Sequence, residues 1–233
     1  PPEKGIRRLL NRLAACKRRG QRVVFVDIFD QPLERNPWKY LRRLGYDHAW
    51  VVEHHFLEEY SHSPSPESFL AAASQRTKNI RLGHGIFQLT TNHPARVAER
   101  VAVLDLLSNG RCEFGMGESA SITELTPFGR DMETKKEVFE EAVAAIFPMF
   151  KDGGSEHHGK YFDIPLRNVV PKPVQKPFIP VWFGGDADAV LQRTARYGSG
   201  WWPFLTKPET FPDKIDYIKS QPDYAGKLED VFY

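Results

Sequence analysis

The sequence WVVEHHF, residues 50–56, places a carboxylate and two histidines directly after three apolar residues. A histidine that is held by a neighbouring carboxylate such as Glu53 can act as a base near neutral pH. Neighbouring residues of a strand point to opposite sides, so at most one of His54 and His55 faces a site while the other packs outward. General acid–base chemistry is therefore the first hypothesis, and buried structural histidines are the alternative.

A metal site is the competing chemistry for this part of the chain. Five candidate ligands are close in sequence, namely His48, Glu53, His54, His55 and His62. None of them has the H-x-H or H-E-x-x-H spacing that presents two imidazoles on one face. We therefore predict no bound metal.

The sequence WFGGDADA indicates a second candidate site. A strand that ends at Gly184 and Gly185 and leads into a helix at Asp186 presents backbone N–H groups that can bind a phosphate. Since Asp186 itself repels an anion, backbone donors up to Ala187 must hold the phosphate, and Lys136 on another helix can supply positive charge. The alternative is a tight turn in which Asp186 caps the helix.

Length and composition narrow the function classes. The 233 residues are 41% apolar and 27% charged, as in an ordinary globular protein of one large or two small domains. A net charge of +2 provides no overall attraction to nucleic acid or membrane. Cys16 and Cys112 are too few for a disulfide scaffold. No stretch resembles a secretory signal or has membrane length, so we expect a cytoplasmic protein.

Strands and helices alternate along the chain. Residues 1–20 are expected to form a separate basic amphipathic helix, and residues 21–233 a second domain. Within that domain an irregular segment rich in Pro and Gly occupies residues 151–177. The strands are predicted at residues 23–28, 48–52, 80–85, 112–117, 180–185 and 200–203, with a seventh beginning at residue 230. The helices are predicted at residues 36–46, 65–77, 93–110, 132–150, 186–198 and 207–220.

This alternation predicts a parallel sheet covered by helices, either as an open doubly wound sheet or as a (β/α)8 barrel of the TIM type. No GxGxxG follows the first strand, which weakens the dinucleotide-binding open sheet. Polar residues or glycines instead follow several strands, and in a barrel these ends converge on one mouth. We therefore expect a barrel, with these residues at its mouth: Asp27, Glu53 to His55, His84, Gly85, Met116 to Glu118, and Gly184 to Asp186.

Four stretches together resemble one known family, the bacterial luciferase-like flavin-dependent monooxygenases. They are WVVEHHF, NIRLGHGIFQLTTNHPARVAERVAVLDLLSNGRCEFGMGE, FGRDMETKKEVFEEA and PKPVQKPFIPVWFGG, in the family's order and spacing between about Tyr46 and Trp202. The resemblance implies a (β/α)8 barrel. Because the pattern holds six complete strands and the start of a seventh, the barrel is expected to be incomplete at its C-terminal end.

The resemblance also implies an activity. Members use reduced FMN, delivered by a separate flavin reductase, and O2 to oxidise a small organic substrate through a peroxyflavin. A homodimer across the second and third helices is implied as well. One branch of the family uses a deazaflavin instead, although the EHHF motif of this chain favours FMN. A non-catalytic flavin-binding or scaffold subunit is the alternative from another functional class.

Finally, the resemblance assigns roles to residues of this chain. It makes His54 the acid–base residue beside the flavin and makes Gly85–Ile86 a non-proline cis peptide under the flavin ring. Two positions depart from the family, with Gly117 where many relatives have arginine and Ala187 where several have serine. The residues expected to contact the cofactor are Glu53, Gly85, Ile86, Met116, Gly117, Glu118, Lys136, Gly184, Gly185, Asp186 and Ala187.

Overall fold

The computed structural model describes residues 23–26, 46–203, 206–228 and 230–231. The basic helix expected over residues 1–20, the helix expected over residues 36–46 apart from Tyr46, and Asp27 lie outside these described residues. In the described part of the chain, no helix has both the length and the apolar character needed to cross a membrane.

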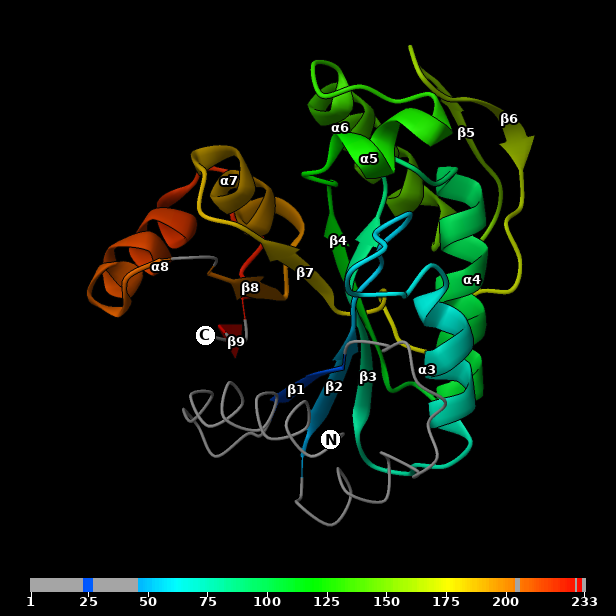
Figure 1. Ribbon diagram of the computed structural model, residues 1–233, viewed down its shortest axis with the longest axis horizontal. Helices are drawn as coiled ribbons and strands as arrows, with labels where there is room; N and C mark the ends of the chain where they lie inside the picture. Colours follow the sequence, from blue (N-terminus) through cyan, green and yellow to red (C-terminus); the bar gives the residue numbers. More distant parts are fainter. Residues whose placement is uncertain (1–22, 27–45, 204–205, 229, 232–233) are drawn as a thin grey trace.

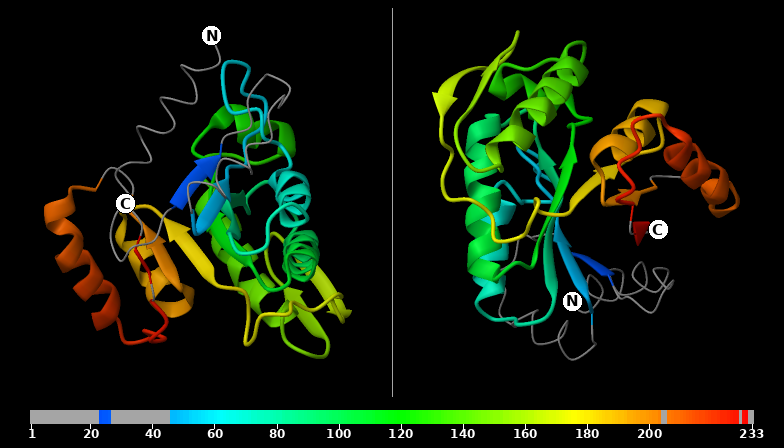
Figure 2. Two further views of the ribbon diagram at one scale, coloured as in Figure 1. Left: turned by 90° about the horizontal axis from the view of Figure 1, so that it is seen from below. Right: turned by 180° about the vertical axis from the view of Figure 1, so that it is seen from behind.

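Seven strands form one sheet, and every neighbouring pair in it is parallel. Their order in the sheet follows their order in the sequence, as in a (β/α)8 barrel, and the sheet curls as part of such a barrel (Figures 1 and 2). The six predicted strands and the start of the seventh are confirmed. They are β1 (Val23–Val26), β2 (His48–Val51), β3 (Arg81–Gln88), β4 (Cys112–Gly117), β7 (Val181–Gly184), β8 (Gly200–Trp202) and β9 (Asp230–Val231).

Helices cover the outer face of the sheet (Figure 1). Each predicted helix within the described residues is present: α3 (Pro66–Ser74), α4 (Pro94–Ser108), α6 (Lys135–Met149), α7 (Asp188–Tyr197) and α8 (Phe211–Ser220). In α4, the apolar residues Val97, Val101 and Leu104 recur at helical spacing and are buried in the main core. This face packs on the sheet, which confirms one of the two orientations that the sequence allows, toward the barrel or toward a partner.

The segment predicted as irregular instead contains an antiparallel hairpin of β5 (Ser155–His158) and β6 (Asp163–Arg167). Glu141 on α6 anchors the hairpin because its carboxylate accepts hydrogen bonds from the backbone N–H groups of Tyr161, at 3.0 Å, and Phe162, at 2.7 Å. The hairpin is mostly exposed, so its sequence lacks the alternation of apolar and polar residues that indicates a half-buried strand. The two strands could therefore not be predicted from the sequence.

Side chains alternate between the two faces of the sheet, as pleated strands require. In β4, Cys112, Phe114 and Met116 point to the helices and belong to the main core. On the inner face a separate cluster contains Trp50 and two further tryptophans. The tryptophan side chains therefore pack on the inner face of the sheet, and the mouth, formed by the carboxyl ends of the strands, lies directly above them.

Candidate active site at the carboxyl ends of β2, β3 and β4

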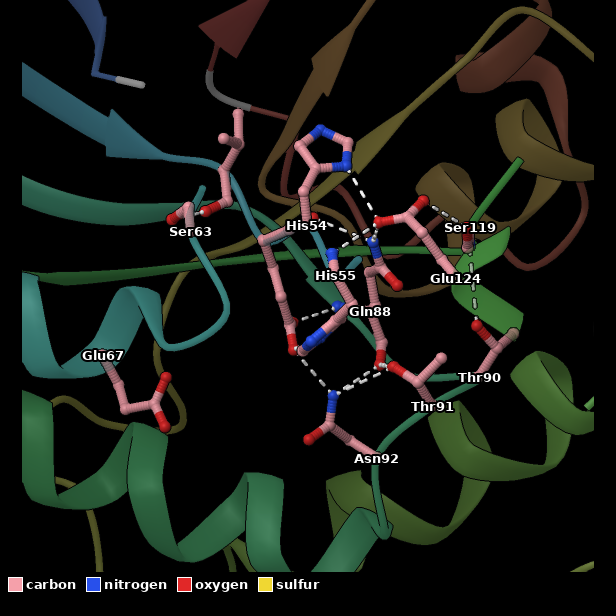
Figure 3. A network of polar contacts seen from close by, with 12 residues as sticks. His54, His55, Ser63, Glu67, Gln88, Thr90, Thr91, Asn92, Ser119 and Glu124 are labelled. Carbon is pink, nitrogen blue, oxygen red and sulfur yellow. Dashed lines mark hydrogen bonds and ion pairs between the residues drawn. The ribbon is translucent and has the colours of Figure 1, made fainter. Parts of the chain in front are cut away.

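A network of polar side chains lies where β2, β3 and β4 end (Figure 3). The residues after β2 contribute two histidines and a glutamate, and the short helix α5 (Ile122–Leu125), which the sequence analysis missed, contributes another glutamate. The carboxyl ends of parallel strands are the usual place for an active site in a barrel. The members of the network are Glu53, His54, His55, Gln88, Asn92, Ser119 and Glu124.

His54 is paired with Glu124. The distance from His54 Nδ1 to Glu124 Oε1 is 3.0 Å, and the same oxygen accepts a hydrogen bond from the backbone N–H of His55 at 3.0 Å. The His54 side chain is 32% exposed, whereas that of Glu124 is 3% exposed. Figure 3 shows the opposite edge of the His54 ring pointing away from the network. Glu124 thus holds the Nδ1 edge of the imidazole, and the Nε2 edge is open to a ligand.

Hydrogen bonds keep Glu124 ionised. Burial raises the pKa of this carboxyl, but hydrogen bonds from Ser119 Oγ, Gln88 Nε2, the His55 N–H and His54 outweigh it and hold the pKa below its usual value. A carboxylate accepts hydrogen bonds and cannot donate them. The hydrogen of the neutral His54 ring therefore lies on Nδ1, and Nε2 has the free lone pair of a base.

Glu53 orients His55 rather than His54. Its Oε1 lies 3.0 Å from His55 Nε2 and also accepts a hydrogen bond from Asn92 Nδ2 at 2.9 Å, while its Oε2 accepts one from the backbone N–H of Gln88 at 2.7 Å. The residue is buried. The expectation that Glu53 could hold the catalytic imidazole is thus corrected, because β2 ends at Val51 and, in the loop beyond it, the Glu53 carboxylate lies against His55. Direct contact of Glu53 with a cofactor remains a prediction.

Aromatic rings line the rim beside the two histidines, with Tyr60 next to His54 and with Phe56 and Phe128 next to His55. The ring centroid of Tyr60 lies 6.3 Å from that of His54, and the rings of Phe56 and Phe128 are 5.6 Å apart. Phe56 is 57% exposed and has a φ of 58°, a left-handed conformation that is rare for a bulky residue. Residues in sparsely populated backbone conformations cluster at ligand sites, and exposed apolar side chains that lie together mark binding surfaces, so the rim suits an organic ligand.

The Gly85–Ile86 peptide bond is cis, as the resemblance implies. It lies within β3, which continues past it to Gln88 instead of ending there. A Cβ atom at Gly117 would lie 2.7 Å from Ile86 Cγ1, which explains why this strand end has a glycine. Gly85, Ile86 and Gly117 are therefore brought together at the mouth.

Met116 and Glu118 lie on either side of Gly117 at the end of β4. Met116 is 1% exposed and packs in the main core, so its side chain faces the helices and not a ligand at the mouth. Glu118 forms an ion pair with Lys135, with Nζ and Oε2 3.2 Å apart, and Lys135 Nζ also donates to the carbonyl of Ser119 at 2.8 Å. Strand alternation thus turns the Met116 side chain toward the helices, and contact of Met116 and Glu118 with a cofactor stays a prediction.

The expected phosphate loop is formed only in part. Gly184 is exposed, and Gly185 has a φ of 125°, which other residues rarely adopt. The Gly185 N–H, however, donates to the Trp202 carbonyl at 3.0 Å, so this expected donor is already used. Lys214 Nζ lies 2.6 Å from Asp186 Oδ1 and neutralises that carboxylate. In the first turn of α7 the Val190 N–H already donates to the Ala187 carbonyl at 2.8 Å, so the remaining candidate donors are the N–H groups between Asp186 and Ala189.

Lys136 is exposed on the first turn of α6, whereas its neighbour Lys135 turns toward the end of β4. The sequence also missed Gln88, Asn92, Ser119 and Glu124. These residues are ordinary polar types without a motif of their own, and only the ends of β3 and β4 bring them to the histidines. Within the described residues, no group of three His, Cys, Asp or Glu side chains is arranged to hold a metal ion.

Comparisons with known proteins agree with this architecture. The family model for luciferase-like monooxygenases matches residues 38–231. The oxygenase component of flavin-dependent trigonelline monooxygenase from Acinetobacter baylyi is 32% identical, over 60% of this chain and 39% of its own length. F420-dependent glucose-6-phosphate dehydrogenase from Amycolatopsis mediterranei is 28% identical, over 81% of this chain and 59% of its own length.

Solved structures share the fold. The oxygenating constituent of 3,6-diketocamphane monooxygenase from Pseudomonas putida, solved in complex with FMN, superposes with a TM-score of 0.70 and 20% sequence identity. The match covers 78% of this chain and 54% of that chain. The chain therefore spans about half the length of the relatives that it matches.

Proposed function

Because the chain belongs to the luciferase-like monooxygenase family, we propose that it is the oxygenase of a flavin-dependent monooxygenase that uses reduced FMN and O2 to oxidise a small organic substrate. The observation that carries the proposal is the pairing of an open His54 with a buried Glu124 at the carboxyl ends of the parallel strands. The aromatic rim beside His54 supports an organic substrate.

In this proposal His54 moves the proton. Its Nε2 takes a proton from a group bound above the mouth or returns one to it, while Nδ1 stays hydrogen-bonded to Glu124. The carboxylate stabilises the imidazolium that forms and keeps the ring in one orientation, so Glu124 is a positioning residue. Positioned acid–base groups typically contribute about a hundred- to ten-thousandfold in rate.

The residues present fit a flavin phosphate. The loop from Gly184 to Ala187 is open, the first turn of α7 supplies N–H donors, and Lys214 removes the charge of Asp186. In the proposal these donors and Lys136 hold the phosphate, and Gly85, Ile86 and Gly117 lie beside the ring. Glu118, paired with Lys135, lies at the same end of β4. Reduced flavin, when bound, supplies the electrons that activate O2.

A deazaflavin-dependent oxidoreductase is the second candidate. The F420-dependent glucose-6-phosphate dehydrogenase aligns with more of this chain, 81%, than the trigonelline oxygenase does, 60%. Both candidates use the same mouth and the same histidine. They differ in the cofactor that binds and in whether O2 is consumed.

Two partners belong to the proposal. A separate flavin reductase supplies reduced FMN, as for an oxygenase component such as the trigonelline relative. A second copy of the chain packs on α3 and α4, where Val103, Leu106 and Leu107 are exposed although α4 already buries its other face. Light scattering at micromolar concentration tests the homodimer, and a monomer would contradict it.

The deciding experiment is a titration of the protein with FMN, reduced FMN and F420, followed by O2 uptake with reduced FMN. We expect FMN to bind and reduced FMN to support O2 uptake. Lys136→Ala should weaken FMN by about 1–2 kcal/mol, the scale of one charge-assisted hydrogen bond, and leave riboflavin unchanged because it lacks the phosphate. Binding of F420 alone would favour the second candidate. FMN binding without O2 uptake would indicate a non-catalytic flavin-binding subunit.

A further inference from the structure

Three tryptophans fill the inside of the barrel directly below the mouth. Ring centroids of Trp50 and Trp202 are 4.5 Å apart, and those of Trp182 and Trp202 are 5.4 Å apart with nearly parallel planes. Together they form a separate cluster on the inner face of the sheet, and Ile86 packs against it. Large aromatic side chains contribute most of the buried apolar area at such places.

Glycines on the neighbouring strands make room for the indoles. A Cβ atom at Gly83 would lie 2.0 Å from Trp50, and one at Gly115 would lie 2.4 Å from Trp202. The ring positions are therefore set by the backbone of β3 and β4 rather than by adaptable side chains. A cluster packed in this way leaves little space for a ligand between the rings.

Trp202 is the uppermost member of the cluster. It is the last residue of β8 and lies opposite Gly184, the last residue of β7. Its exposed fraction is 8%, against 0% for Trp50. Ile86 packs beside the cluster and against Gly117. Trp202 and Ile86 therefore both lie directly below the mouth.

We propose that Trp202 and Ile86 form the floor of the mouth, and that Trp202 sets how deep a ligand can enter the barrel. This inference rests on the proposed function for the identity of the ligand, because a closed floor selects planar ring systems that lie across the strand ends. A chain-like apolar group that needs depth along the barrel axis is excluded. Removing the Trp202 ring should join the mouth to the interior around Trp182.

The test compares Trp202→Ala with Trp201→Ala. Trp201 is the neighbour of Trp202 in sequence but faces the opposite side of the sheet, where it packs with Leu191 and Phe211 below α7 and α8. The probes are indole, which is planar, and 1-octanol, which is chain-like. The reporter is the indole N–H resonance of Trp182, which lies below the floor and donates to Glu113 in the folded protein.

In Trp202→Ala we expect both probes to shift the Trp182 resonance and to bind about tenfold or more tightly than to the unmodified protein, because they bury apolar surface in the opened space. In the unmodified protein and in Trp201→Ala the Trp182 resonance should stay unchanged. If Trp202→Ala does not fold, Trp202→Phe should give a smaller shift in the same direction.

Two outcomes would overturn the inference. One is a folded Trp202 variant in which neither probe moves the Trp182 resonance. The other is a shift of that resonance by 1-octanol in the unmodified protein, which would mean that the floor is already open. Neither readout needs a cofactor, so failure of FMN to bind the unmodified protein would contradict the proposed function and leave the floor intact.

Discussion

Two clusters of histidine and glutamate lie at opposite ends of the same strands. At the amino ends, Glu113 accepts hydrogen bonds from Arg81 Nε and, at 2.6 Å, from Trp182 Nε1. His48 Nε2 lies 3.8 Å from Glu113 Oε1. At the carboxyl ends, Glu124 is bound by His54 and by three further donors. Both carboxylates are buried, with side chains 4% and 3% exposed.

The difference lies in the histidines and their surroundings. The His48 side chain is 6% exposed and stacks on Trp50, whereas that of His54 is 32% exposed. Burial, and then the positive charge of Arg81, lower the pKa of His48 to about 4, while Asp47 opposes this shift. The same residue types thus build a closed structural cluster where arginine and tryptophan satisfy the carboxylate. They build a candidate chemical site where one ring nitrogen faces outward.

The largest expected effect separates the two histidines by turnover. His54→Ala should lower substrate oxidation by about a hundred- to ten-thousandfold because it removes the acid–base group, with FMN affinity largely unchanged. His48→Gln at the other end should leave turnover of the folded protein within about threefold, since His48 has no part in proton transfer. Steady-state kinetics with a titrated flavin measure both. Equal losses in the two variants would refute the assignment of chemistry to the carboxyl ends.

The second effect concerns stability, which should depend more on the cluster at the amino ends than on the cluster at the carboxyl ends. Glu113→Gln removes the partner of Arg81 in a largely buried setting, and breaking a buried pair costs about 3–5 kcal/mol. Because the Arg81 side chain is 30% exposed, we expect the lower end, about 3 kcal/mol, in the free energy of unfolding measured with urea. FMN binding should be unchanged. A Glu113→Gln protein as stable as the unmodified one would show that this cluster is not structural.

The third effect is a dependence of stability on pH. Burial lowers the pKa of both His48 and His84 from 6.5 to about 4, so folding keeps both rings neutral. The unfolded chain binds protons on them below about pH 6.5, so the free energy of unfolding should decrease from there to about pH 4, by about 3 kcal/mol for each ring. The His84 ring lies beside the rings of Phe87 and Phe114, so His84→Phe should fold and should remove the part of the pH dependence that His84 contributes. An unchanged pH profile would contradict this account.

The smallest effect tests how Glu124 supports His54. Glu124→Gln keeps the shape but replaces the acceptor carboxylate beside His54 Nδ1 with an amide that can also donate, so the ring is no longer held in one tautomer and turnover should fall by about tenfold, with FMN affinity unchanged. Glu124→Asp, which restores the charge, should recover part of the rate. If Glu124 only packs the loop, the loss of rate would follow the loss of stability, and Glu124→Asp would recover neither.

The regular elements could be predicted because their signals are local. Continuous apolar runs such as the one before Gly184 indicate buried parallel strands, and α4 begins at Pro94 and ends where Asn109 has a φ of 57°. The cis bond at Gly85–Ile86 followed from the family resemblance. The hairpin of β5 and β6 and the helix α5 could not be found, because one is mostly exposed and the other has only four residues.

The sequence by itself determined the order of strands and helices and the barrel type, since these depend on residues that are neighbours along the chain, and the family resemblance singled out His54 as the candidate base. Only the tertiary structure decided which carboxylate serves which histidine. Glu53 is one residue from His54 yet binds His55, whereas Glu124, 70 residues away, binds His54. The physical reason is that β2 ends at Val51, and the loop beyond it, held by a hydrogen bond from the His54 N–H to the Ser63 carbonyl at 3.0 Å, sets the direction of each ring.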